Sequence, residues 1–193
     1  MTKVLLTGFE PFGKATLNPS GEIVKQIKGD NIVTAILPVA YAQSAEALIA
    51  LIEHHKPDVV ISLGQAEGRT QITPERIAIN LDDARLADNQ GVMRNEVPIV
   101  LDGPVAYEST LPVKEIVKAI NDAGVPAAVS LSAGAFLCNH VFYVAQDHFK
   151  GTKVRSGFVH VPLMDEQGPE FPGLPTMPLD QMVKAVRTML EVL

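Results

Sequence analysis

Cys138, the only cysteine in the 193-residue chain, is the residue with the clearest potential for nucleophilic chemistry. A glycine-containing turn at residues 132–134 precedes it, and the apolar residues that follow this turn recur at helical steps, as Leu137, Val141 and Val144 do. The free backbone N–H groups and partial positive charge of a helix N-terminus favour a thiolate. The position suits a cysteine nucleophile, but a small buried hydrophobe would fit it too, because free cysteine is among the most buried residue types.

A thiol nucleophile needs a base within hydrogen-bond reach, and three histidines compete for that role. His140 lies two residues from Cys138, so on a helix its side chain points about 200° away from the thiol. His148 lies more than two turns further along. His160 is left, on the same alternating face as Phe158 in the predicted strand 153–161.

An acid that orients the histidine would complete the group. The continuous apolar stretch at residues 58–63 is typical of a strand buried on both faces of a parallel sheet, and it leads into a long polar segment at residues 64–91. Open α/β sheets bind their ligands at the carboxyl ends of such strands. The spacing does not choose among the candidate acids of this segment, which are Glu75, Asp82, Asp83 and Asp88.

Alternating strand and helix patterns predict a three-layer α/β/α sandwich around a mixed, mostly parallel sheet, of the phosphorylase/hydrolase-like kind. The length and the absence of a composition break favour a single catalytic domain over residues 1–193. An antiparallel sheet edge is expected within residues 64–91. The proline-rich residues 162–178 suggest a mobile lid or an interface arm. Strands are expected at residues 4–7, 32–37, 58–63, 76–81, 97–101, 127–130 and 153–161, and helices at 18–29, 41–55, around 113–120, after Cys138 and at 179–193.

Composition excludes several classes of function. A net charge of −6 argues against nucleic acid or an anionic membrane as the main partner, because both need basic patches. The N-terminus reads as a strand and not as a signal peptide, and no apolar run approaches the length of a membrane span. A lone cysteine favours a reducing, cytoplasmic location. One cysteine and five scattered histidines give no metal-ligand spacing, and no phosphate-binding signature is present, so no metal or cofactor is expected.

Four blocks of the sequence resemble the pyroglutamyl peptidase I family, also called pyrrolidone carboxyl peptidases, which are intracellular cysteine peptidases. The blocks are VLLTGFEPFG with NPS (residues 4–13 and 18–20), GQAEGRTQITPERIAINLDDAR with DN (64–85 and 88–89), SAGAFLCNHVFY (132–143) and the weaker GFVHVP (157–162). The resemblance implies removal of an N-terminal pyroglutamyl residue from peptides through a thioester, and it implies a homotetramer.

The resemblance also implies roles for individual residues. Cys138 would be the nucleophile, His160 the general base and Glu75 the acid that orients it. Arg85 would give oxyanion or loop support. The residues implied in substrate binding are Phe9, Phe12, Asn18, Gln65, Phe136 and Leu137.

Some of these residues also have purely structural explanations. Asn18 before Pro19 is a favourable helix N-cap, and the two phenylalanines of the loop at residues 8–13 could fold into the core as readily as line a pocket. Two alternative functions fit the same scaffold: a non-catalytic ligand-binding module and a nucleoside-phosphorylase-like enzyme. The second would need a phosphate site, for which the sequence offers no clear glycine-rich or basic candidate.

Overall fold

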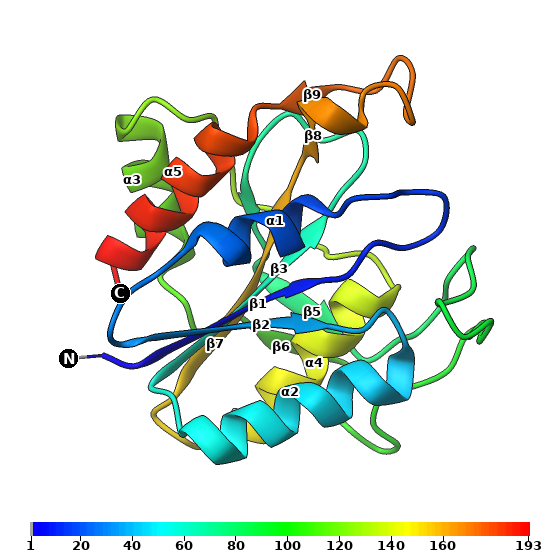
Figure 1. The fold of residues 1–193 in the computed structure, drawn as a ribbon. Coiled ribbons are helices and arrows are strands. Elements are labelled where there is room, and N and C mark those ends of the chain that lie inside the picture. The colour runs from blue at the N-terminus through cyan, green and yellow to red at the C-terminus, as the bar shows by residue number, and fades with distance from the viewer. Residues whose placement is uncertain (1) are drawn as a thin grey trace.

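The computed structural model describes residues 2–193 and has a five-stranded sheet between two layers of helices (Figure 1). The strand order is β2-β1-β3-β7-β4, and the first four strands are parallel. The last strand, β4, pairs antiparallel with β7, so the predicted mixed sheet and its antiparallel edge are confirmed. The strands of this sheet are β1 (Val4–Phe9), β2 (Ile32–Leu37), β3 (Val59–Gln65), β4 (Thr73–Pro74) and β7 (Arg155–Val161).

The helices divide between the two faces of the sheet (Figure 1). Helices α1, α3 and α5 pack together on one face, while α2 and α4 pack together on the other. Their bounds are α1 (Pro19–Gln26), α2 (Tyr41–His55), α3 (Val113–Asp122), α4 (Leu137–Phe149) and α5 (Leu179–Glu191). Within residues 2–193, none of these helices combines the length and apolarity needed to cross a membrane.

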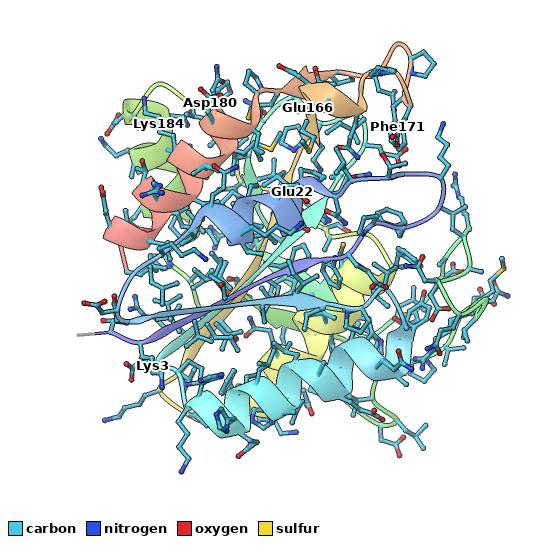
Figure 2. The ribbon with its side chains drawn as sticks, in the orientation of Figure 1. Lys3, Glu22, Glu166, Phe171, Asp180 and Lys184 are labelled. Carbon is cyan, nitrogen blue, oxygen red and sulfur yellow. The ribbon has the colours of Figure 1, made fainter. Side chains whose placement is uncertain are left out.

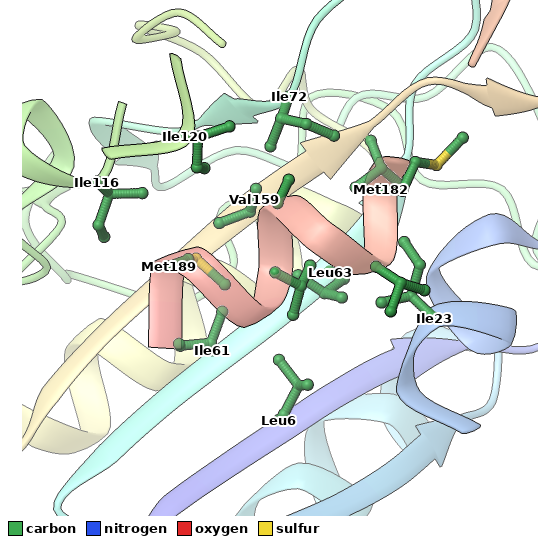
Figure 3. Close-up of a cluster of buried hydrophobic side chains, with 14 of the residues drawn as sticks. Leu6, Ile23, Ile61, Leu63, Ile72, Ile116, Ile120, Val159, Met182 and Met189 are labelled. Atoms are coloured by element: carbon green, nitrogen blue, oxygen red, sulfur yellow. The ribbon is translucent and has the colours of Figure 1, made fainter. Parts of the chain in front are cut away.

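Alternation along the strands decides which face each side chain reaches, because successive residues of a strand point to opposite faces. Ile61 and Val159 face α1, α3 and α5, where Figure 3 shows strand residues meeting Ile23 of α1 and Met182 of α5. Phe158 packs in the second core cluster, with residues of α2 and α4. By the same alternation His160 faces α4, the helix that carries Cys138.

The backbones of β1 and α1 pack closely against each other at Gly8. A Cβ added to Gly8 would lie 2.4 Å from the backbone oxygen of Ser20, so no larger residue fits there without a shift. Asn18 caps α1 as predicted, accepting a hydrogen bond from the Ser20 backbone N–H at 3.1 Å. This packing fixes the end of β1 and the loop that follows it.

Two predicted strands are wrong. Residues 127–130 make only isolated parallel bridges, Ile72 with Ala127 and Glu75 with Ser130, because Pro74 lies between them and has no N–H to continue the ladder. Residues 97–101 make a single antiparallel bridge between Val97 and Asp82. Beyond Pro98, the Asn80 side chain takes over the pairing with Val100, donating to its carbonyl at 2.8 Å and accepting from its N–H at 2.9 Å.

Short elements complete the chain. β5 (Ile77–Ile79), which falls within the predicted strand 76–81, pairs antiparallel with β6 (Ala106–Glu108). β8 (Leu163–Met164) pairs parallel with β9 (Thr176–Met177), and a 3₁₀ turn, η1 (Asp165–Gln167), lies between them.

The proline-rich residues 162–178 are tied to the loop after β1. The Glu170 carboxylate accepts hydrogen bonds from the backbone N–H, at 3.1 Å, and the hydroxyl of Thr16. The ammonium of Lys14 lies 4.7 Å from the ring centre of Phe171, which Figure 2 labels at the upper right. These contacts hold the two segments together, and the lid or interface role stays a prediction.

Candidate active site

A cavity of about 430 Å³ opens at the carboxyl ends of β1 and β3, beside the start of α4. This is the edge at which a parallel sheet is expected to bind ligands. It brings together eight of the residues singled out in the sequence: Phe9, Phe12, Asn18, Gln65, Phe136, Leu137, Cys138 and His160. The rest of the lining consists of Val39, Ala66, Glu67, Arg69, Ser132, Ala133 and Gly134.

Cys138 is the second residue of α4, as the sequence predicted, and its side chain is partly exposed. Its sulfur lies directly over Gly64 of β3, since a Cβ built on that glycine would be 2.8 Å from Sγ and 2.6 Å from Cζ of Phe158. Gly64 is the register partner of His160 on β7. Neighbouring strands lie about 4.8 Å apart, so the thiol and the histidine are held over adjacent positions of the sheet.

Gly64→Ala is expected to reduce turnover by about 100-fold, because its methyl group would displace the thiol and small displacements of reacting groups are costly. Turnover numbers of the purified variant measure the effect. Gly29→Ala is the matched control, since the nearest atoms to its added Cβ belong to flexible side chains, with Ile32 Cδ1 the nearest at 3.0 Å. Unchanged turnover in Gly64→Ala would contradict this account of the thiol position.

The carboxylate that reaches His160 is Glu75. Its Oε1 lies 2.7 Å from Nδ1 of the imidazole, and the Glu75 side chain is fully buried. Of the other acids left open by the spacing, Asp83 is exposed and Asp88 accepts from the backbone N–H of Tyr41 at 3.0 Å. Asp82 bonds a different histidine. A buried carboxylate on Nδ1 fixes the tautomer and leaves Nε2 as the proton acceptor.

The other two candidate histidines are engaged elsewhere. His140 Nδ1 lies 2.8 Å from Oδ2 of Asp82, which also accepts from Arg94 at 2.6 Å. His148 lies near the end of α4, 3.4 Å from a carboxylate oxygen of Glu53. Neither lines the cavity.

Aromatic rings form much of the cavity wall. Phe9 is almost fully buried at the end of β1, and Phe12 is half-buried with its ring centre 6.1 Å from that of Phe136. Both readings of the phenylalanine loop therefore hold for Phe9, which is a core residue and a wall of the cavity. Asn18 donates from its side-chain amide to the Glu10 carbonyl at 2.9 Å and so braces this loop.

Gln65 and Arg85 have contrasting surroundings. Gln65 is buried, and its Oε1 accepts a hydrogen bond at 2.9 Å from Gln167 in the proline-rich stretch. Its Nε2 has no hydrogen-bond partner among residues 2–193. Arg85 is exposed and lies outside the cavity lining, so its position does not support an oxyanion role, and loop support stays a prediction.

A family model for pyroglutamyl peptidase matches residues 2–193. The chain belongs to the pyroglutamyl peptidase family. It is 47% identical to a pyrrolidone-carboxylate peptidase of Vibrio vulnificus, over 98% of this chain and 92% of that protein. A second relative, from Bacillus licheniformis, is 48% identical over 96% of this chain and 89% of its own length.

Solved structures of the family share the whole fold. The crystal structure of pyroglutamyl peptidase I from Bacillus amyloliquefaciens matches with a TM-score of 0.96 at 43% identity, covering all of this chain and 96% of that one. A mutant pyrrolidone carboxyl peptidase from Pyrococcus furiosus matches with a TM-score of 0.93 at 42% identity, covering 98% and 97%. The three-layer fold is therefore that of the pyroglutamyl peptidases.

The electrostatics of the site favour a neutral resting pair in this member of the pyroglutamyl peptidase family. Burial, with a further contribution from the Glu75 carboxylate, raises the pKa of the Cys138 thiol to about 12, although Arg69 and a backbone hydrogen bond lower it. Burial and Arg69 lower the pKa of His160 below its usual 6.5, against the opposing effect of Glu75. The thiolate expected from the helix start is outweighed by burial, so the thiol needs a base.

Sequence reasoning missed three residues of this pyroglutamyl peptidase site. Gly64 gives the thiol its space, Gln167 binds the Gln65 amide, and Arg69 bonds the Glu75 carboxylate at 2.8 Å. Of these three, Gly64 and Arg69 lie in the polar segment at residues 64–91, where a ligand site was expected. Among the described residues, no group of three or more His, Cys, Asp or Glu side chains is placed to hold a metal ion.

Proposed function

We propose that this protein removes the N-terminal pyroglutamyl residue from peptides as a cysteine exopeptidase. One observation carries the proposal: the Glu75–His160 hydrogen bond stands beside Cys138 at the end of an aromatic-lined cavity. Membership in the pyroglutamyl peptidase family supports it. The comparisons offer no support for a non-catalytic binding module or a nucleoside-phosphorylase-like enzyme.

In the proposed mechanism Cys138 is the nucleophile, His160 the general base and Glu75 the group that orients the imidazole. His160 Nε2 takes the thiol proton as the sulfur attacks the exocyclic carbonyl of the pyroglutamyl residue. The imidazolium then gives this proton to the leaving amine, and a C–S thioester replaces the broken C–N bond. Water, deprotonated by the same imidazole, hydrolyses the thioester and regenerates the thiol.

The negative oxygen that forms during attack needs donors. α4 has no side-chain cap at its N-terminus, and the N–H groups of a first helical turn have no intrahelical acceptor. We assign the Cys138 backbone N–H as one oxyanion donor. A fixed N–H costs no reorganisation when the charge develops.

Substrate choice follows from the size and polarity of the cavity. Pyroglutamate is a small uncharged lactam, and we assign Phe9, Phe12 and Phe136, with Leu137, as its apolar walls. We assign Gln65 as the partner of a lactam polar group. Its Nε2 lacks a partner within residues 2–193, and a buried unpaired donor is costly unless a ligand satisfies it.

We further propose a single catalytic domain over residues 1–193 that acts in the cytoplasm as a homotetramer. Support for self-association comes from the large apolar side chains that are exposed on the segment between β5 and β6. Six of the nine exposed large apolar side chains among the described residues lie on this segment, and Leu101 and Val105 are 79% and 85% exposed. A gathering of exposed apolar side chains is typical of an interaction surface. Light scattering during gel filtration measures the assembly directly.

Release of 7-amino-4-methylcoumarin from its pyroglutamyl derivative tests the activity. We expect release from pyroglutamyl-7-amino-4-methylcoumarin, none from the prolyl analogue that lacks the lactam carbonyl, and none after treatment with iodoacetamide. Cleavage that survives alkylation, or equal cleavage of both substrates, would refute the proposal.

The pH profile of kcat/KM should show an acid limb with a midpoint below 6.5, because His160 must be neutral to accept the proton and its pKa is lowered. Activity is lost below that midpoint and is retained above it. The raised pKa of Cys138 places the alkaline limb well above neutrality, so a broad plateau is expected. Stopped assays from pH 4.5 to 10 measure this, and a midpoint above 7 would contradict a buried neutral imidazole.

A further inference from the structure

Arg69 joins three parts of the site through its guanidinium. One nitrogen, Nη1, donates to Glu75 Oε1 at 2.8 Å and to the hydroxyl of Thr73 on β4. The other, Nη2, donates to the backbone carbonyl of Ser132 at 3.3 Å. The side chain is 27% exposed and lines the cavity.

We propose that Arg69 is a positioning residue for the reaction, which holds the Glu75 carboxylate in place against His160 and ties it to the segment that leads into the Cys138 helix. This inference rests on the proposed function, and it adds to that function a residue that acts through the Glu75 carboxylate.

The Glu75 carboxylate has two hydrogen-bond partners among the described residues. It is fully buried, its Oε2 has no partner among the described residues, and its Oε1 is shared by Arg69 and His160. A buried carboxylate is costly unless it is paired and hydrogen-bonded. The guanidinium supplies a charge-assisted hydrogen bond to Glu75 Oε1. Arg69 therefore keeps Glu75 able to stabilise the imidazolium that forms during the reaction.

Arg69 also connects Glu75 to the segment that leads to Cys138. Ser132 begins the turn before α4, which passes through Gly134 at a φ of 76° and reaches Cys138 in the first turn of the helix. The bond from Arg69 to the Ser132 carbonyl fixes this turn relative to Glu75. One side chain thus couples the position of the acid to that of the thiol.

The charge of Arg69 acts on both Cys138 and His160. The positive charge of Arg69 lowers the pKa of the Cys138 thiol and also lowers the pKa of His160. Loss of that charge raises both values. The thiol would then be harder to deprotonate, and the imidazole would stay protonated to higher pH.

The chain contains a second group of the same construction that serves as a control. Arg94 donates to Asp82 at 2.6 Å, and Asp82 bonds His140 Nδ1 at 2.8 Å. Arg94 is 28% exposed and Asp82 is fully buried, as in the first group. This second group does not line the cavity, so its loss removes an equivalent buried ion pair without touching the reacting groups.

The experiment compares Arg69→Gln, Arg69→Lys and Arg94→Gln in the full chain with pyroglutamyl-7-amino-4-methylcoumarin. Arg69→Gln should lower kcat by about 10- to 100-fold, the usual cost of losing a partner that orients a functional histidine or its carboxylate, with little change in KM. The acid limb of its kcat/KM profile should move to higher pH. Arg69→Lys should recover part of kcat, because it keeps the charge but not the planar fork. Arg94→Gln should keep wild-type kcat and pH profile, whatever it does to the melting temperature.

Alkylation of Cys138 by iodoacetamide at pH 8 gives a readout that does not depend on the substrate. Arg69→Gln should be alkylated more slowly than wild type, by about tenfold for each unit of rise in the thiol pKa. If wild type releases no fluorophore, the proposed function fails, and the alkylation rates still decide the role of Arg69. Equal alkylation rates in wild type and Arg69→Gln overturn this inference, as does an equal loss of kcat in Arg94→Gln.

Discussion

Cys138→Ala is expected to lower kcat by at least about 1000-fold while the protein remains folded. Removal of the proposed nucleophile should leave only the contribution of binding and oxyanion stabilisation, which is small beside the full rate. The side chain is partly exposed to the cavity, and alanine is smaller, so the variant introduces no clash with Phe158 below it. The measurement is kcat with the fluorogenic pyroglutamyl substrate, together with the thermal melting curve.

Cys138→Ser separates chemistry from shape. It keeps nearly the same volume, but its hydroxyl is a far weaker nucleophile, so it should be almost as inactive as Cys138→Ala. Because the chain has no other cysteine, both variants should take up no iodoacetamide. Turnover above about one hundredth of wild type in both variants would exclude a covalent role for this thiol.

His160→Ala is the second large effect, with an expected fall in kcat of about 1000-fold and little change in KM. In the proposed mechanism the imidazole accepts the thiol proton and later gives it to the leaving amine, so the variant loses the proton carrier for both steps of acyl-enzyme formation. Cys138 should also react more slowly with iodoacetamide. Steady-state kinetics and alkylation rates measure the two consequences.

The control for His160→Ala is His148→Gln. His148 lies on the same helix as Cys138 but is 29% exposed and pairs with Glu53 away from the cavity. Its replacement should leave kcat within about twofold of wild type, because substitutions of partly exposed residues away from the cavity and the core have small effects. A similar loss in both variants would mean that His160 acts through the general stability of the fold.

The elements with a clear period could be predicted from the sequence alone. The strand β2 (Ile32–Leu37) and the helix α2 (Tyr41–His55) have the expected bounds. The strand is a short apolar run closed by Pro38, and the apolar residues of the helix recur at three- and four-residue steps. The strand predictions at residues 97–101 and 127–130 are wrong because strand formation there depends on hydrogen-bond partners far along the chain. A local sequence pattern does not contain those partners. In each case a proline or a side-chain amide interrupts a ladder that the apolar run alone would suggest.

The candidate site likewise has parts that local sequence patterns predict and parts that depend on tertiary contacts. Helical geometry was enough to set aside His140 and to point to His160, because both steps depend only on the chain near Cys138. The spacing left four acids open, since the choice depends on how the segment after β3 folds back along β7. Arg69 and Gln167 gave no signal in sequence, because an arginine or a glutamine in a polar segment is normally solvated and only tertiary contact gives it a role.

The hydrogen bond between Glu75 and His160 joins residues that lie 85 positions apart in the chain. Between them come β5, β6, α3 and α4, and the strand that carries His160 is connected to its partner β3 through this whole crossover. Contacts of such high sequence separation form late, because the entropy of closing a long loop must be overcome first. During refolding, helical circular dichroism should therefore return before peptidase activity. Activity in this protein reports the completed topology and not the presence of its separate elements.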